Sequence, residues 1–555
     1  MLDRRDFLKS SALFSSTSSI LGPLLTSDKV MAGLRSYERS KSLRDISPLI
    51  NIPSFNGTNQ ISGDTPDEAH EVFWNKPGFI KKHGGLPSPT GKFDIVIVGG
   101  GLAGLTAAYH AKDKNVLMLE GNPRLGGNAK VERYKKTFMS LGSAYVTVPE
   151  EGGHIDNFFE DLGLKKHFRK IPRGQDPVLF KGEYADSFWS GHTDPANKDE
   201  FLKVYKKLAQ IYKNEYPDLP LIPGQKINRK ALNQLDMLTL KDWVKREFGD
   251  IHPHIKEYFH QYCWSSFSSS YDEISAAQFL NFFTADLAGI QALPGGNGMI
   301  GVGVLKKLRN SNFKVNTTSF VVDVREHNNG VYICFFDQSQ KKLRAVLAKK
   351  CIFAAPKLVA KHIIEGLDPI QHKAMDNMVY HAYLVANVLL KKHIDPRHYD
   401  LYSLIGKVPT SEYKDSRSRV FSDITFAHWA NQESATNSAL TLYLPLPYSM
   451  AQQFLFAHTL YEKYSGRIKK RLSPVLDNLG SSWDDVKGIR LTRYGHSVAV
   501  ASRGGIASGL YERAHKSINN KIFFANQDNW ANPCFETSFA VGTVAAYQAL
   551  GKDFS

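Results

Sequence analysis

The sequence predicts an α/β protein in which a Rossmann-like, doubly wound domain is interrupted by a mixed α+β domain. Three observations lead to this fold class. A β-branched apolar run at 93–98 passes directly into a glycine-rich turn, as a buried parallel strand feeding a helix should. A second apolar run at 115–119 completes a compact βαβ unit. Short strand patterns return far along the chain, at 351–356 and 521–528, with long helix-forming and strand-forming segments between them.

Composition bounds the class of protein before any motif is considered. The chain has 555 residues, 42% hydrophobic and 22% charged, which is typical of globular proteins and excludes wholesale disorder. No apolar run approaches the ~20 residues of a membrane-spanning helix, so we expect no stable membrane anchor. The net charge of +16 comes mostly from scattered basic pairs. This distribution favours a solvated basic surface over a nucleic-acid or membrane patch, and we expect no nucleic-acid partner.

Motifs of several enzyme classes are missing. The four cysteines form no CxxC pair, so a thiolate zinc site and covalently attached haem lack support, and we expect no metal site. Buried free thiols are the favoured interpretation, and a single disulfide is the alternative. No HExxH, GxSxG or P-loop sequence occurs, so hydrolase and nucleotidase activities also lack support.

The N-terminus has the features of an export signal. Arg4 and Arg5 precede a modestly apolar stretch at 12–25, and Val30-Met31-Ala32 ends it with a small-residue cleavage pattern. The paired arginines predict a twin-arginine signal peptide over 1–32, the export machinery as a partner, and a periplasmic or secreted protein. A frayed basic N-terminus is the alternative. Residues 33–92 are predicted to be an irregular leader with one short helix starting near Thr65.

The turn after the first strand predicts a dinucleotide site. Gly99 permits the tight turn, Gly101 lets the backbone approach a pyrophosphate, and Gly104 lets helix and strand pack closely. Glu120 follows Gly99 by 21 residues, where a carboxylate accepts hydrogen bonds from a ribose diol. The helix N-terminus would face the phosphate charge. The predicted contacts here are Gly99, Gly101, Leu102, Ala103, Gly104 and Glu120.

A second glycine pair decides between nicotinamide and flavin dinucleotides. Gly126, Gly127 and Asn128 resemble the GG motif of flavoproteins, and the segment Gly142-Ser143-Ala144 resembles the one that passes the flavin ring. With these motifs the chain resembles the flavin amine oxidase superfamily, which includes monoamine and polyamine oxidases. The resemblance implies FAD as the cofactor and a Rossmann-like FAD-binding domain of the amine oxidase (GR2) type.

The resemblance continues along the chain in family order and adds further cofactor contacts. It implies that Val321 or Val322 holds the adenine, that Ala355 lies on a strand returning to the cofactor, and that Asp528 is the acid near the last strand. It also implies that the helix beginning at Phe535 and Glu536 faces the flavin. The implied domains are discontinuous: 93–150, 291–360 and 520–551 bind FAD, whereas 151–290 and 361–519 form the substrate domain.

The expected function is oxidation of an amine or polyamine by hydride transfer to flavin N5. His496 and Trp530 are the catalytic candidates. His496 would act as a hydrogen-bond donor, proton acceptor or haem ligand, with a solvated or core histidine as the alternative, and Trp530 would wall the substrate site. One tension exists, because a protein of charge +16 needs a local acidic region to attract a cationic polyamine.

One departure from the family pattern bears on the electron acceptor. Many family members hold a lysine near flavin N5, but the corresponding strand carries Val385 and Ala386. This departure favours a dehydrogenase using an electron carrier over an oxidase using dioxygen. Residues 383–391, 493–496 and 525–528 resemble the corresponding segments of spermidine dehydrogenase-like exported members, some of which carry haem; no motif here supports haem. The alternatives are an FAD-dependent desaturase or isomerase acting on an apolar substrate, and a non-catalytic flavoprotein electron carrier.

Overall fold

The computed structural model describes residues 46–55, 60–65, 67–172, 176–408, 420–431, 437–448 and 450–553. All of these belong to one unit, Ser42–Ser555. The predicted signal peptide at 1–32 lies outside the described residues, so export stays a prediction.

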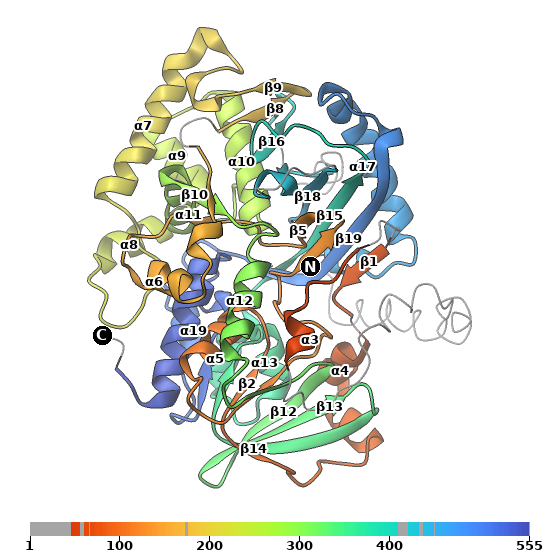
Figure 1. The fold of residues 1–555 in the computed structure, drawn as a ribbon. Helices are drawn as coiled ribbons and strands as arrows, with labels where there is room; N and C mark the ends of the chain where they lie inside the picture. Colours follow the sequence, from red (N-terminus) through yellow and green to blue (C-terminus); the bar gives the residue numbers. More distant parts are fainter. Residues whose placement is uncertain are drawn as a thin grey trace. The chain divides into compact units, whose positions relative to one another are not determined.

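The first sheet has the parallel core that the sequence predicts (Figure 1). Its strands are buried between helices, because β-branched residues such as Ile95 to Val98 have no polar face to offer water. The last two parallel strands join segments about 170 residues apart, with Phe353 in register with Phe524. The parallel strands, in order, are β11 (Phe313–Asn316), β3 (Val116–Leu119), β2 (Lys92–Val98), β14 (Lys342–Phe353) and β20 (Ile522–Phe524). The sheet is extended by β13 (Gly330–Asp337), which pairs antiparallel with β14, and by β12 (Ser319–His327), which pairs antiparallel with β13.

Two helices that pack unusually closely cover the first sheet. Helix α5 (Leu102–His110) follows the glycine-rich turn, and α19 (Phe535–Leu550) is the last helix. A Cβ atom at Gly542 of α19 would lie 2.4 Å from the carbonyl oxygen of Ala103, so only glycine permits this approach. The first residues of α5 and of α19 both lie at the carboxyl edge of the parallel strands, where open α/β sheets bind their ligands.

The second sheet has eight strands and is mainly antiparallel. Successive side chains of its long central strand, β15 (Tyr380–Leu390), pack alternately into two different apolar clusters, as expected for a strand covered on both faces. Tyr383 and Val385 belong to one apolar cluster, whereas Leu384 and Ala386 pack into another with helix α17 (Leu460–Asn478). The strand order is β1 (Gln60–Gly63), β19 (Val486–Ala499), β15 (Tyr380–Leu390), β18 (Ala439–Leu446), β17 (Asp423–Phe426), β16 (Asp400–Leu404), β8 (Val178–Phe180) and β9 (Glu183–Ala185).

The leader is more regular than the sequence indicates. Strand β1 pairs in parallel with β19, placing Gln60 opposite Arg490. Helix α4 (Asp67–Lys82) starts two residues after Thr65, as predicted, but continues to Lys82 through a non-helical residue at Asn75. Strand β1 forms because β19 would otherwise lie at the edge of the sheet, and the unpaired backbone groups of an edge strand pair readily with an extended segment from elsewhere in the chain.

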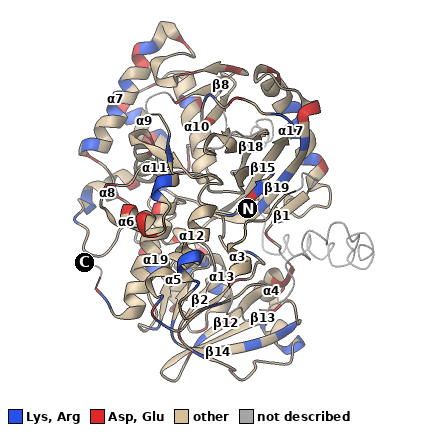
Figure 2. Cartoon of the chain, viewed as in Figure 1, with Lys and Arg blue, Asp and Glu red and all other residues tan. Residues whose placement is uncertain are grey.

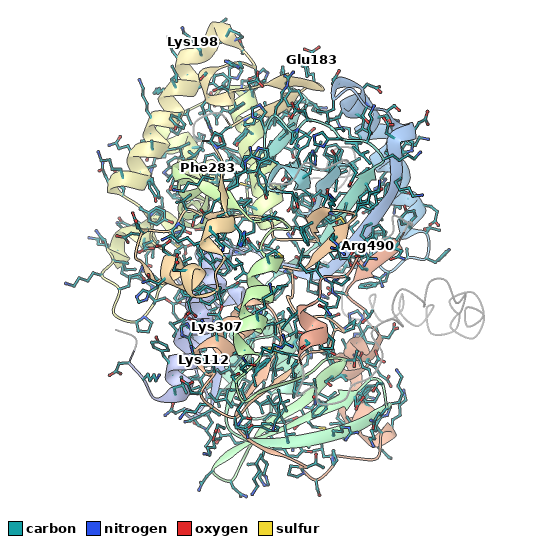
Figure 3. All side chains as sticks on the ribbon, in the orientation of Figure 1. Lys112, Glu183, Lys198, Phe283, Lys307 and Arg490 are labelled. Carbon is teal, nitrogen blue, oxygen red and sulfur yellow. The ribbon has the colours of Figure 1, made fainter. Side chains whose placement is uncertain are left out.

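Several further helices follow from their own sequences. Helix α7 (Lys198–Asn214) buries apolar residues at helical spacing, and Thr239 forms a capping box with α9 (Leu240–Phe248). The aromatic residues of α10 (Pro253–Phe267) and α11 (Ala276–Ala288) pack together, with the rings of Tyr262 and Phe283 4.5 Å apart. In Figure 3, Phe283 lies inside this layer, whereas Lys198 lies on α7 at its outer edge.

The structure can be compared with three predictions made from composition: a scattered basic surface, no membrane-spanning helix, and free cysteine thiols. Lys and Arg are spread over several elements, including α7, α8 (Arg229–Asp236) and α17 (Figure 2). Within the described part of the chain, no helix is both long and apolar enough to cross a bilayer. All four cysteines are free thiols.

Candidate active site

A cavity of about 520 Å³ extends from the carboxyl edge of the first sheet to the inner face of the second. Most of the predicted cofactor residues line it, although their contacts with a cofactor remain predictions. Those that line it are Gly99, Gly101, Leu102, Ala103, Glu120, Gly126, Gly127, Asn128, Gly142, Ser143, Ala144, Val321, Ala355, Asp528, Phe535 and Glu536. The cavity has two chemically different ends, which we call the dinucleotide cradle and the acidic chamber.

The dinucleotide cradle is formed by backbone. Gly99 has φ +106°, a conformation that side chains disfavour, and a Cβ at Gly104 would lie 2.1 Å from the carbonyl oxygen of Gly99. Gly101 differs from both: its φ is −71°, and a Cβ there would have only the Cα of Gly127 nearby, at 3.8 Å. Gly101 therefore borders open cavity. Gly104 packs the helix against the strand, as the sequence predicts, but it does not line the cavity, so its predicted cofactor contact is not supported.

Glu120 is held firmly in the cradle wall. Its Oε2 accepts a hydrogen bond from the Gly100 N–H at 2.7 Å, and its Oε1 accepts one from the Asn122 N–H at 2.7 Å. A carboxylate has about four acceptor positions, so two remain for hydroxyl groups of a ligand. This geometry fits the predicted ribose contact.

The second glycine pair brings a cation that sequence analysis missed. Gly126 and Gly127 both have positive φ, and Lys130 Nζ donates to the Gly127 carbonyl oxygen at 2.7 Å. Withdrawal from water lowers the pKa of Lys130, which the nearby Glu120 and Asp64 partly offset. Among the described residues that line the cavity, Lys130 is the only lysine or arginine. Its position two residues after Asn128 was the available signal.

The structure distinguishes neighbouring residues on two strands, β12 and β15. Val321 lines the cavity, whereas Val322 is completely buried in the core, because successive residues of a strand face opposite sides. Val385 lines the cavity for the same reason, and Ala386 does not.

Trp530 does not line the cavity, so its predicted role as a substrate wall is wrong. Its side chain is buried, with its ring 5.1 Å from that of His515, and its carbonyl oxygen accepts from Gln278 Nε2 at 2.6 Å. The short 3₁₀ turn Gln527–Asn529 explains the error, because it turns Asp528 toward the cavity and Trp530 into the core.

His496 lines the cavity at its cradle end. Its ring lies 6.4 Å from that of His70, edge to face, and its neighbour Ser497 accepts from Asn128 Nδ2 at 3.1 Å. Burial, with the positive charges of His70 and Lys361, lowers the pKa of His496 to about 4. His496 is therefore neutral at physiological pH and supplies no cation to the cavity.

The acidic chamber is built from side chains of separate elements. Asp286 on α11 accepts from Tyr145 Oη at 2.8 Å and from Tyr262 Oη at 2.5 Å. Asp400 and Asp423 begin strands β16 and β17, and the Ser422 hydroxyl donates to Asp423. All three carboxylates line the cavity together with a set of tyrosines: Tyr145, Tyr383, Tyr402 and Tyr443. No sequence pattern marks these acids, since they come from three distant segments.

Burial and mutual repulsion make the chamber acids unusually weak. Burial raises the pKa of Asp286 to about 7 and that of Asp423 to about 6. The pKa of Asp400 rises to about 8, first because of burial and then because of the nearby charges of Asp423, Asp176 and Asp286. All three acids consequently titrate near neutral pH, and the charges of the other two contribute to the shift of Asp400.

The chamber adjoins the segment predicted to pass the flavin ring. Tyr443 Oη donates to the Gly142 carbonyl oxygen at 2.7 Å, and Tyr399 Oη donates to that of Ala144 at 3.0 Å. At the start of α19, Glu536 Oε1 accepts from the Thr147 N–H at 2.7 Å. Residues of both ends therefore meet around 142–147. No group of three metal-ligating side chains is found among the described residues.

Comparisons with known proteins agree with this geometry. A family profile described as an NAD(P)-binding Rossmann-like domain matches residues 97–162. Oxidoreductase PigB of Serratia sp. (strain ATCC 39006) is 24% identical over 82% of this chain and 74% of its own length. The probable flavin-containing monoamine oxidase A of Dictyostelium discoideum is 26% identical over 40% of this chain and 50% of its own. A triple-mutant putrescine oxidase structure superimposes with a TM-score of 0.61 at 16% identity, covering 83% of this chain and 99% of its own.

These comparisons confirm the α/β Rossmann-like fold and the similarity to flavin-containing amine oxidases that the motifs indicate. The relatives are oxidoreductases, in agreement with the predicted enzyme class. They imply a flavin cofactor.

Proposed function

We propose that this relative of flavin-containing amine oxidases is an exported FAD-dependent oxidoreductase that oxidises an amine or polyamine by hydride transfer to flavin N5. One observation carries the proposal: a backbone cradle suited to a dinucleotide opens into a chamber of carboxylates and tyrosines in the same cavity. When bound, FAD would supply the hydride acceptor, and the chain supplies binding, orientation and charge.

The cradle fits FAD on the observations of this structure. Gly101 leaves room where a diphosphate would lie, Lys130 supplies a nearby positive charge, and Glu120 keeps acceptor positions for sugar hydroxyls. The Asn128 side chain is tied to Ser497, which keeps this wall in place. FAD, rather than another flavin, is supported because Val321, which the resemblance assigns to the adenine, and Glu536, which it assigns to the flavin side, line the same cavity.

The chamber supplies the local acidity that a protein of charge +16 needs to bind a cationic amine. Ammonium groups bind well between carboxylates and aromatic faces, and both are present around Asp400 and Tyr402. An amine must lose its proton before its α C–H bond can deliver hydride. Asp286 and Asp400, which titrate near neutrality, are the groups suited to take that proton.

An apolar substrate would fit the chamber poorly. It would leave the carboxylates without a cationic or hydrogen-bonding partner when water is displaced, which is costly. The desaturase or isomerase alternative is therefore disfavoured.

The test is anaerobic mixing of the FAD-loaded protein with a panel of monoamines, diamines and polyamines, followed by flavin absorbance. We expect amines to bleach the flavin, and Asp286→Asn to weaken half-saturation about 10-fold or more, because the charged partner of the ammonium is lost. Asp113→Asn, at an exposed position, is the matched control. Flavin that stays oxidised with every amine would overturn the proposal, and would leave the electron-carrier alternative.

Export is supported by the sequence alone. Replacing Arg4 and Arg5 by lysine keeps the charge but alters the twin-arginine signal. We expect the precursor to stay in the cytoplasm, as measured by fractionation and N-terminal sequencing. Mature protein recovered outside the cytoplasm in unchanged yield would contradict this route.

A further inference from the structure

A completely buried lysine lies behind the cavity wall, outside the residues discussed so far. Lys357 is the first residue of helix α13 (Lys357–Ile363) and has no exposed surface. Its Nζ forms an ion pair with Asp528 and donates to the side chain of Asn529. Asp528 lines the cavity and Lys357 does not, so the lysine contacts the cavity only through this carboxylate.

The Asp528 carboxylate is held by donors from two elements. The Lys357 N–H donates to Oδ2 at 2.7 Å, and Tyr380 Oη, at the start of β15, donates to the same oxygen at 2.7 Å. The Lys357 ammonium occupies one position on Oδ1. Because a carboxylate has about four acceptor positions, these three contacts leave one, on the oxygen paired with lysine.

Charge balance explains why a lysine is needed there. FAD carries a negatively charged diphosphate, and an uncompensated buried carboxylate in the wall of its site would repel it. The ion pair cancels the charge of Asp528 while leaving its oxygen as an acceptor. A buried pair is weak evidence for stability as such, since well-packed apolar residues often do as well.

We infer that Lys357 is a positioning residue for the cofactor: it keeps Asp528 charge-balanced and oriented so that the carboxylate accepts a hydrogen bond from a hydroxyl group of bound FAD. This inference rests on the proposed function, because it requires that the cavity holds FAD. The competing explanation is a purely structural ion pair that fastens α13 to the turn at Gln527–Asn529.

The experiment measures FAD dissociation constants on cofactor-stripped protein by flavin fluorescence, for wild type, Lys357→Met and Lys349→Met. Lys349 is the matched control, because it forms an ion pair with Asp94 at 2.8 Å but its side chain is 78% exposed. We expect Lys357→Met to bind FAD at least about 10-fold more weakly at pH 8, since an uncompensated carboxylate then lies in the wall of a site for an anionic ligand. The defect should shrink at lower pH, because protonation of the unpaired carboxylate removes its charge.

The double variant Lys357→Met/Asp528→Asn keeps the test decisive if the single variant folds poorly. It removes both charges, so we expect a melting temperature near that of wild type and an FAD dissociation constant within about threefold of it. An FAD affinity of Lys357→Met equal to that of Lys349→Met would overturn the inference, as would a double variant that binds as weakly as the single one. Wild-type protein that binds no FAD would overturn the proposed function as well.

Discussion

The two ends of the cavity are built by different means. The wall of the cradle is formed mainly by glycines and backbone groups, which belong to two short segments, 99–104 and 126–130. In the acidic chamber, the polar groups are side chains of Asp286, Asp400 and Asp423, which lie on three elements. Backbone recognition suits a cofactor that does not vary, whereas side chains are free to change with the substrate.

The ends also differ in charge. The cradle contains Lys130, and the Lys357 ion pair balances Asp528 behind its wall. The chamber acids line a cavity in which no other lysine or arginine is found among the described residues. One end is thus prepared for an anionic ligand and the other for a cationic one. Each of the following predictions changes one end and asks whether the other responds.

The largest expected effect is the loss of cofactor in Gly101→Val. The structure has room for a Cβ at this position, and its φ of −71° suits any residue, so the fold should survive while the valine occupies space needed by the diphosphate. We expect purified protein with native circular dichroism and essentially no flavin absorbance. Gly466→Val, where the added Cβ meets nothing within 4 Å, should keep its flavin. Full flavin content in Gly101→Val would contradict the cradle assignment.

The second effect concerns electron disposal where the two ends meet. Reduction of dioxygen develops negative charge, but the chamber holds carboxylates, and the described residues that line the cavity include no lysine or arginine other than Lys130. His496, at the cradle end, is neutral. Reduced wild-type protein should therefore react slowly with dioxygen and readily with a quinone or phenazine. Val385→Lys should speed the oxygen reaction by about 10-fold or more, because a nearby cation stabilises the charge.

Stopped-flow reoxidation of photoreduced protein measures both rates. Val385→Met is the control for side-chain length at the same position. Wild-type protein that is reoxidised by aerated buffer as quickly as by the dye would contradict the prediction of a dehydrogenase.

The third effect is a pH dependence confined to the chamber. A quaternary ammonium ligand keeps its charge at all pH values, so its affinity should rise several-fold as the acids ionise between about pH 6 and 8. Asp400→Asn should flatten the upper part of this rise and leave FAD binding unchanged. Isothermal titration across this pH range provides the measurement, and a rise of equal size in Asp400→Asn would contradict it.

Asp400→Asn should weaken the binding of a cationic ligand at high pH but stabilise the folded protein. Because the pKa of Asp400 is raised in the folded state, folding retains a proton that the unfolded chain releases, and stability falls as pH rises toward 8. Asp400→Asn should therefore melt at a higher temperature than wild type at pH 8, with a smaller difference at pH 5.

The smallest expected effect on turnover is that of Trp530→Phe. Since its ring packs against His515 and not in the cavity, kcat/KM should change by less than about threefold, while the lost packing lowers the melting temperature slightly. Steady-state kinetics and calorimetry measure the two quantities. A large loss of kcat/KM with unchanged melting would restore Trp530 as a wall of the substrate site.

How much the sequence predicts follows from how local each feature is. The parallel strands, the glycine turn and Glu120 were all predictable, because a cofactor that contacts backbone demands particular residues at fixed spacing. The choice between Val321 and Val322 was not, since it depends on which face of β12 meets the cavity. The leader was underestimated because strand β1 forms only when β19 offers it an edge.

By itself, the sequence determined the fold class and the cradle. Both depend on residues that lie close together along the chain, and the glycine turn and the helix after it require a particular spacing of those residues. Only the tertiary structure decided that Trp530 is buried, that Lys357 balances Asp528, and that Asp286, Asp400 and Asp423 share one chamber. The physical reason is that electrostatic function depends on distance and burial in space. Residues more than a hundred positions apart acquire shifted pKa values only once the chain has brought them together and excluded water.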